Sequence, residues 1–468
     1  MHSHQVLEAT IAQHLDPNRK AFEEYWEQRE KYPQAELWKP FLAGYTAALG
    51  KRRSVLRFDT AERLEYERDS QEVLDDCEVT ELDAPSWRWL LRRIGDLPNT
   101  TILIAARPTS TGLLRQRLLD AHGDRVLLLE IAGFTLGETE AYFQATEFGR
   151  QVADESVEMV EKIHLLAGGR PILIALALDW LARGMWDSRL YPVSVAELRT
   201  GKTQAQAEEE AGQHGEAWQQ WHKTRQQFEA VLVGQIRRLA TPLDIAVCYA
   251  ALCRKGCNAA ILSRLMGIGE KETSGLVEEL LELSFVKPPR PGSHGLFFLH
   301  DEMYDLMEKY VWLVDWPDYH EQERLDEEII SWYSEQISAL DESIRAARDW
   351  WGKNRLRREQ QLLMTERLYY QFDADPRLGY REYSHLDEEA IARREHEWDT
   401  WLRNEALWFT SHRAWRRGKQ GSTDADYPRR DPAWLQLGKV ARSPAVDYDN
   451  RRRWVTRYIA RNEMEKAA

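Results

Sequence analysis

The sequence has few cysteines, no long hydrophobic run and no excess of positive charge. Four cysteines in 468 residues do not make the disulfide framework of a small secreted protein. The longest apolar stretch, residues 171–181, is interrupted by Asp179 and is shorter than the roughly 18 residues of a membrane span. The amino terminus, Met-His-Ser-His-Gln, has neither the basic nor the apolar segment of a signal peptide. These absences predict a cytoplasmic globular protein without a membrane span.

The formal charge is moderately negative, with 63 Lys and Arg residues against 77 Asp and Glu residues and a net charge of −14. Nucleic acid is therefore an unlikely general partner, because binding by counterion release requires clustered cations. Hydrophobic residues make up 43% of the chain and charged residues 30%, as in ordinary folded proteins. At roughly 100–200 residues per domain, this length predicts three or four domains.

Three short apolar runs in the first third of the chain are typical of buried strands. They cover residues 54–58, 101–106 and 126–131, and the last two are almost wholly apolar. Runs of this length without alternation suit strands that are buried on both faces of a parallel sheet. Helical patterns lie between them, at residues 86–94 and 112–122. This alternation of strand and helix predicts βαβ units.

Further helical patterns flank this α/β region. Apolar residues recur at helical spacing through the first 50 residues. After the third run, Thr135 and Glu138 have the spacing of a capping box, which predicts the start of a helix. Two more helices are expected at residues 155–166 and 172–181. The polar segment 199–223 is interpreted as a linker or surface insertion.

The segment 224–312 has the pattern of helices followed by a two-stranded ribbon, which is typical of a winged helix. The expected helices cover residues 228–239, 243–252, 259–266 and 271–283. Two short strands at residues 285–287 and 296–299 are separated by the proline- and glycine-rich residues 288–292. The chain beyond Trp316 has helical patterns and is rich in tryptophan, arginine and glutamate.

Asp59 and Arg107 are candidate catalytic residues because each follows a predicted strand. A carboxylate after a buried strand is the arrangement of a Walker B element, which holds Mg²⁺ beside a nucleotide. The structural alternative is that Asp59 and Glu62 form only the capping box of the next helix. An arginine at the end of a neighbouring strand can contact a γ-phosphate, and the alternative for Arg107 is a solvated loop residue.

Two more candidate motifs lie in the helical part of the chain. Gly169-Arg170-Pro171 joins two predicted helices. Its structural alternative is a glycine that ends one helix and a proline in the first turn of the next. His300 and Asp301 follow the last predicted strand, and Asp301 alternatively caps the following helix.

Taken in order, these motifs resemble the STAND class of P-loop ATPases, the signalling ATPases that include the apoptotic and plant-immunity NB-ARC proteins. The resemblance covers residues 50–312. It implies that Asp59 is the Walker B acid, which holds Mg²⁺ through water. It also implies that Arg107 is the sensor-1 arginine, and Glu62 completes the candidate catalytic set.

The same resemblance implies ATP or ADP as the ligand. Pro171, with Gly169 before it, would lie against the adenine. His300, followed by Asp301, matches the Met-His-Asp motif of the class, whose histidine contacts the β-phosphate of bound ADP. In the intact class, exchange of ADP for ATP opens a closed molecule for assembly, and hydrolysis resets the switch.

The phosphate-binding loop of this class, Gly-x-x-x-x-Gly-Lys-Ser/Thr, does not occur before residue 54. A Gly-Lys-Thr at residues 201–203 has Ala196 where the first glycine belongs, and it lies after the Gly-x-Pro motif. The strand that carries the loop is central in the sheet of the class. We therefore expect an incomplete parallel sheet and a chain that binds or hydrolyses ATP poorly.

The expected fold class is α/β plus all-α, with four domains. These are a partial ATPase core at 1–148, a helical lid and linker at 149–223, a winged helix at 224–316 and a helical region at 317–468. The end of the last region resembles a tetratricopeptide-type helix.

The expected function is a nucleotide-switch signalling or regulatory protein with protein partners and a capacity for self-assembly. The alternative is a non-enzymatic adaptor or transcription regulator, in which the winged helix and the helical tail bind a partner or DNA. The predicted recognition helix, residues 271–283, holds four glutamates and one lysine. Because these carboxylates would repel phosphate, DNA is the less favoured partner.

Overall fold

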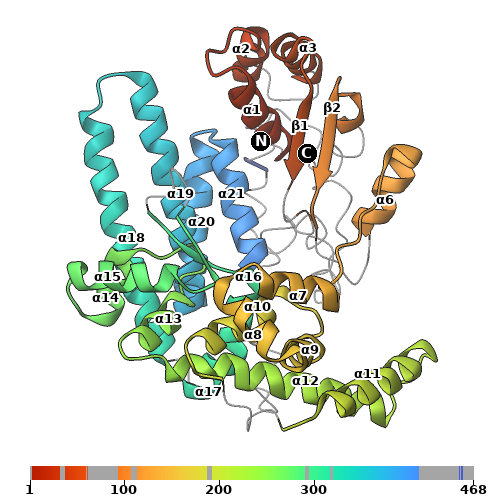
Figure 1. Ribbon diagram of the computed structural model, residues 1–468. Coiled ribbons are helices and arrows are strands. Elements are labelled where there is room, and N and C mark those ends of the chain that lie inside the picture. The colour runs from red at the N-terminus through yellow and green to blue at the C-terminus, as the bar shows by residue number, and fades with distance from the viewer. Residues whose placement is uncertain are drawn as a thin grey trace. The chain divides into compact units, whose positions relative to one another are not determined.

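A computed structural model describes residues 3–31, 37–58, 61, 93–106, 113–186, 192–289, 295–316, 320–409, 453 and 455–456. The described chain is mostly helical, with one parallel and one antiparallel pair of strands (Figure 1). It divides into two compact units. Unit 1 contains residues 1–128 and 333–468, and unit 2 contains residues 129–332.

Unit 1 begins with three helices, as the apolar spacing predicts. These are α1 (Ser3–Leu15), α2 (Glu23–Lys31) and α3 (Trp38–Leu49). They are followed by β1 (Ser54–Phe58), η3 (Ile94–Asp96), β2 (Thr100–Ile104), α6 (Leu113–His122) and η4 (Gly123–Arg125). β1 and β2 pair in parallel, with Ser54 opposite Thr100 and Phe58 opposite Ile104. The parallel pairing of the first two predicted strands is therefore confirmed.

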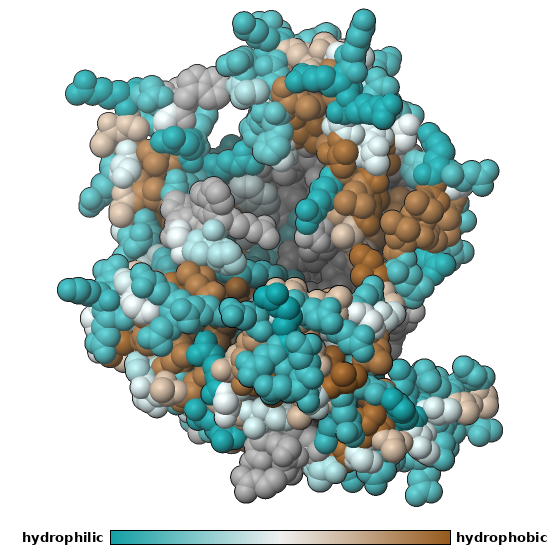
Figure 2. All heavy atoms as spheres, viewed as in Figure 1, coloured by the Kyte–Doolittle hydropathy of each residue, from teal (hydrophilic) through white to brown (hydrophobic). Residues whose placement is uncertain are grey.

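The two faces of this sheet have different environments. Its packed face contacts the core of α1 to α3 through Leu56, Phe58, Ile102 and Ile104. On the other face, Val55 is 66% exposed and Leu103 is 50% exposed. Figure 2 shows hydrophobic side chains gathered along β1 and β2 and across to α6. Parallel sheets are normally covered on both faces, whereas these two apolar side chains of β1 and β2 are exposed.

The prediction of a third strand at residues 126–131 is wrong. These residues belong to no strand, and Leu127 and Ile131 are 81% and 95% exposed. An apolar run becomes a strand only where a neighbouring strand satisfies its backbone N–H and C=O groups. Within the described ranges no strand pairs with this run. The parallel sheet is therefore smaller than the sequence predicts.

The second part of unit 1 consists of long helices, which confirms the helical prediction for the described residues between 320 and 409. They are α18 (His320–Ala346), which crosses from unit 2 into unit 1, α19 (Trp350–Ala374), α20 (Pro376–Ala392) and α21 (His396–Trp408). α19 packs against α20 and α21. Asp375 caps α20 by accepting hydrogen bonds from the backbone N–H groups of Arg377 and Leu378.

The first half of unit 2 is wholly helical in its described residues. It contains α7 (Leu136–Gln144), α8 (Glu147–Glu155), α9 (Val157–Ala167), α10 (Pro171–Ala182), α11 (Val195–Glu210) and α12 (Glu216–Gly234). The capping box is confirmed, because Thr135 Oγ1 accepts from Glu138 N and the Glu138 carboxylate accepts from Thr135 N. The backbone and hydroxyl of Thr135 hold the pKa of Glu138 below its usual value.

Residues 199–223 were interpreted as a linker or a surface insertion, and the linker alternative is wrong. They belong to α11 and α12, which pack against each other as a helical hairpin. A second capping box, between Ser194 and Glu197, begins α11. Glutamine, glutamate, alanine and lysine are good helix formers, so a polar composition is compatible with an exposed hairpin as well as with a linker.

The second half of unit 2 combines short helices with an antiparallel strand pair. The elements are η6 (Gln235–Arg238), α13 (Leu243–Ala250), α14 (Ala259–Met266), α15 (Glu270–Leu281), β3 (Val286–Lys287), β4 (Phe298–Leu299), α16 (Asp301–Met307), η7 (Glu308–Trp312) and α17 (Leu313–Asp315). β3 pairs with β4 in antiparallel orientation, and the backbones of Cys257 and Phe297 form an isolated antiparallel β-bridge. α13, α14, α15, β3 and β4 lie where the patterns predict them, whereas the helix expected at residues 228–239 is the end of the longer α12 followed by η6. In the described part of the chain no helix is long and apolar enough to cross a membrane.

Helix α10 is fixed to the rest of unit 2 near its carboxyl end. Trp180 is fully buried, and its indole Nε1 donates to the carbonyl of Leu232 in α12 at 2.8 Å. Asp179 Oδ2 accepts from the backbone N–H of Ser284, just before β3, at 2.9 Å. Burial raises the pKa of Asp179, and the hydrogen bonds from Ser284 only partly offset that effect.

Asp179→Asn should therefore stabilise the protein at neutral pH. Since the pKa is higher in the folded than in the unfolded state, folding stability falls as the pH rises from about 4 through the raised pKa. Asparagine keeps an acceptor for Ser284 N and cannot ionise. We expect urea denaturation to show a gain of the order of 1 kcal/mol at pH 7 that disappears near pH 4. Asp154→Asn, at an exposed position in α8, is the control for replacing a carboxylate by an amide. An equal gain in stability in that variant would contradict this explanation.

Candidate functional site

The Gly-x-Pro motif forms the turn between α9 and α10. Gly168 ends α9 with a φ of 61°, and Pro171 lies in the first turn of α10. Gly169 also has a positive φ, of 73°, and its carbonyl accepts from Phe134 N at 2.7 Å. A Cβ on Gly169 would overlap the Phe134 carbonyl oxygen. The structural alternative for this motif is thus confirmed. It leaves Pro171 exposed, so a ligand can still reach the proline.

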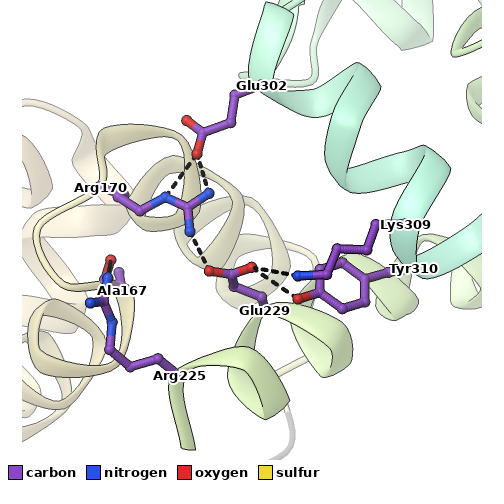
Figure 3. Close-up of polar contacts among 7 residues, drawn as sticks. All are labelled: Ala167, Arg170, Arg225, Glu229, Glu302, Lys309 and Tyr310. Atoms are coloured by element: carbon purple, nitrogen blue, oxygen red, sulfur yellow. Dashed lines mark hydrogen bonds and ion pairs between the residues drawn. The ribbon is translucent and has the colours of Figure 1, made fainter. Parts of the chain in front are cut away.

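Arg170 connects this turn to the segment that follows His300 (Figure 3). Its Nε donates to Glu302 Oε1 at 2.7 Å, its Nη2 contacts the same oxygen, and its Nη1 contacts Glu229 of α12. Burial opposes the charge of Arg170, but the two carboxylates outweigh burial and raise the pKa of the guanidinium. Arg170 directly precedes Pro171, and Glu302 lies two residues after His300. Unit 2 therefore brings two of the predicted motifs together.

Glu229 is shared by three donors. Besides Arg170, it accepts a hydrogen bond from Tyr310 Oη at 3.0 Å, and Lys309 Nζ lies 3.9 Å away. Figure 3 shows Tyr310 and Lys309 on one side of the Glu229 carboxylate and Arg170 on the other. Burial, together with the negative charge of Glu229, raises the pKa of Tyr310. The phenol therefore remains a neutral donor at physiological pH.

Arg225 of α12 lies on the other side of the turn. Its Nη2 donates to the Ala167 carbonyl at 3.3 Å. Its Nε is buried and has no hydrogen-bond partner within the described ranges. A Cβ on Gly168 would overlap this guanidinium, so a glycine there leaves room for the arginine. Burial and the nearby charge of Arg170 lower the pKa of Arg225.

His300 begins α16 and is exposed. Its backbone N–H donates to Phe285 O at 2.7 Å, and its carbonyl accepts from Met303 N at 2.7 Å. Asp301 was the alternative cap, but His300 holds the N-cap position, with no side-chain cap hydrogen bond. Asp301 lies in the first helical turn, with its Oδ1 3.4 Å from Lys287 Nζ. The prediction that Asp301 caps the helix is therefore wrong, because the helix begins one residue earlier than its pattern indicates.

The candidate catalytic residues Asp59, Glu62 and Arg107 lie outside the described residues. The strands that precede them do end side by side, since Ala105 N donates to Phe58 O at 2.8 Å. Residues 201–203 lie inside α11, where backbone N–H groups are occupied by helical hydrogen bonds and cannot cradle a phosphate. In the part of the chain that the structure describes, no group of three or more His, Cys, Asp or Glu residues could hold a metal ion.

Four residues around the turn were not predicted from the sequence: Arg225, Glu229, Lys309 and Tyr310. Arg225 and Glu229 have the i, i+4 spacing of neighbours on one helical face. However, Arg225 lies just after the polar segment 199–223, and an ordinary surface helix shows the same spacing. The pairing of Arg170 with Glu302 joins residues 132 positions apart, and no local pattern indicates such a pairing. The positive charge of Arg170, at the central position of the Gly-x-Pro motif, was the only sequence feature that could have indicated an ion pair at this turn.

The described groups offer limited ligand chemistry. Pro171 presents an exposed apolar ring beside the turn, and His300 presents an exposed imidazole at the start of α16. No protein-family model, no curated protein and no solved structure matches this chain.

Proposed function

We propose that this chain is a nucleotide-switch regulator of the STAND class whose ATPase core is incomplete. The observation that carries the proposal is the Arg170–Glu302 pair, which joins the Gly-x-Pro turn to the His300-Asp301 segment. The two motifs are far apart in sequence and would serve one ligand only if they lay together. Pro171 would face the adenine, and His300 would contact a phosphate.

The parallel pair β1–β2 supports the same proposal for unit 1. In the class, strands of this kind are followed by the Walker B acid and the sensor-1 arginine, which are the roles proposed for Asp59 and Arg107. The exposed apolar residues Val55 and Leu103 and the run 126–131, which pairs with no strand within the described residues, are compatible with a sheet that lacks a neighbouring strand. Protein partners and self-assembly belong to this proposal as properties of the class.

The segment from α13 to β4 would be the winged helix, facing protein rather than DNA. Its third helix, α15, would be the recognition helix of a DNA-binding protein. That helix exposes Glu270, Glu272, Glu278 and Glu279 to solvent. Four carboxylates on this surface would repel a phosphate backbone, so the adaptor alternative is kept only in its protein-binding form.

Calorimetric titration of the full chain with ADP and Mg²⁺ tests the proposal. Asp59 can hold Mg²⁺ only when nucleotide oxygens complete the coordination shell. Without the amide nest and lysine of a phosphate loop, most phosphate recognition is missing. We expect at best millimolar affinity, about −4 kcal/mol, and no measurable ATP hydrolysis.

His300→Ala provides the matched variant for this titration. Micromolar ADP binding that disappeared in His300→Ala would show a complete pocket and contradict the incomplete core. If a chain extended upstream by a phosphate loop bound ADP tightly, the class assignment would stand. Failure of such an extended chain to bind ADP would count against the class itself.

A further inference from the structure

We propose that Arg170 is a positioning residue that holds the first turn of α16, and with it His300, against the Gly168–Pro171 turn. The inference rests on the proposed function, since it assigns to Arg170 the alignment of the two halves of the nucleotide site. It concerns the ion-pair fork that Arg170 makes with Glu302 and Glu229, shown in Figure 3.

The geometry of the fork connects three separate elements. Arg170 is the N-cap residue of α10, Glu229 belongs to α12 and Glu302 to α16. A guanidinium is planar and presents its donors in a fixed arrangement, so two carboxylates bound to it are held at a fixed relative position. The side chains of Arg170, Glu229 and Glu302 are 30%, 12% and 34% exposed. At that partial burial the pairs are less screened than surface pairs.

The two carboxylates depend on Arg170 to different degrees. Glu229 also has Tyr310 and Lys309 as partners, so its position does not rest on Arg170 alone. Within the described residues, Arg170 is the cation that Glu302 contacts. Loss of Arg170 should therefore release Glu302 and the first turn of α16, while Glu229 keeps its partners Lys309 and Tyr310 in η7.

The start of α16 also has contacts with the strand pair. The backbone N–H of His300 donates to the carbonyl of Phe285, beside β3, and Asp301 pairs with Lys287 of β3. The Arg170 fork adds a contact between the first turn of α16 and the Gly-x-Pro turn. It therefore contributes to the position of His300 relative to Pro171.

Hydrogen exchange of the full chain, followed by mass spectrometry, tests this role without any ligand. The peptides to follow cover residues 168–175 and 296–307. In Arg170→Met and in Glu302→Gln, we expect exchange in the first turn of α16 to accelerate at least ten-fold. The double variant should exchange no faster than Arg170→Met alone, because both changes remove the same contact. Arg170→Lys keeps the charge and should restore part of the protection.

Arg199→Met is the matched control. Arg199 makes a similar fork with Glu161, with Nε and Nη2 at 2.5 and 2.6 Å from its two carboxylate oxygens, but it lies in α11. This variant should change exchange in residues 296–307 by less than two-fold. An effect below two-fold in Arg170→Met, additive effects in the double variant, or an equal effect in Arg199→Met would overturn the positioning role.

The same variants separate this inference from the proposed function. ADP titration of the wild type reports the nucleotide site, whereas the exchange experiment contains no nucleotide. If the Arg170 and Glu302 variants accelerate exchange in α16 as expected but ADP does not bind, the positioning role is supported and the nucleotide proposal is contradicted. If ADP binds, Arg170→Met should weaken ADP more than adenosine, since His300 contacts a phosphate; equal weakening would count against the alignment.

Discussion

Gly169→Ala should lower the free energy of unfolding by about 2–4 kcal/mol. Gly169 has a φ of 73°, a region in which an L side chain costs about 1–2 kcal/mol. Its new Cβ would also meet the backbone carbonyl of Phe134. Backbone cannot move aside as the end of a flexible side chain can, and the Phe134 N to Gly169 O hydrogen bond would be strained. Urea denaturation followed by circular dichroism gives the measurement.

Gly184→Ala separates the two causes. Gly184 ends the segment after α10 with a φ of 65°, and a Cβ there would have open space around it. This variant should lose only the conformational contribution, about 1–2 kcal/mol. Equal losses in the two variants would show that the close approach of Phe134 to the Gly-x-Pro turn does not contribute.

Trp180→Ala should lower the free energy of unfolding by about 3–5 kcal/mol. The side chain is fully buried, and its indole donates to Leu232 O of α12 at 2.8 Å. Alanine would leave a large cavity between α10 and α12 and would remove one of the hydrogen bonds that the Leu232 carbonyl accepts. Trp180→Phe keeps most of the apolar contact and loses the hydrogen bond, so about 1–3 kcal/mol is expected. Urea midpoints for the two variants give this ordering directly.

Trp221→Ala is the control for tryptophan removal. Trp221 is only half-buried in the α11–α12 hairpin, so its loss should cost less than that of Trp180. A loss of stability as large as that of Trp180→Ala would contradict the importance of the α10–α12 contact. An unchanged midpoint in Trp180→Phe would show that the indole hydrogen bond is not needed there.

Local signals in the sequence were sufficient to predict most helices. α14 has the predicted bounds, Ala259–Met266, because an asparagine cap precedes an apolar face that a glycine ends. The Thr135–Glu138 capping box locates the start of α7 in the same way. Each of these features depends on residues within one or two turns, so the pattern and the structure have the same cause.

The errors arose where the outcome depends on distant residues. Residues 126–131 have the composition of a buried strand, but strand formation depends on a neighbour that this run lacks among the described residues. Residues 199–223 are polar, and whether a polar segment is a linker or a hairpin depends on what it packs against. The same distinction explains which residues of the candidate site could be predicted. Gly169, Pro171 and His300 follow from motifs, whereas the Arg170 fork depends on two carboxylates brought close by folding.

Saturation-transfer NMR with millimolar adenosine and ADP tests the central claim most directly, namely that the Gly-x-Pro turn and His300 form half of a nucleotide site. The full chain should transfer saturation to the adenine H2 and H8 protons of both ligands to a similar extent. Pro171→Ala should reduce that transfer at least two-fold, whereas Pro376→Ala, at the same position in the first turn of α20, should not. No transfer to adenine, or transfer that Pro171→Ala leaves unchanged, would contradict the account.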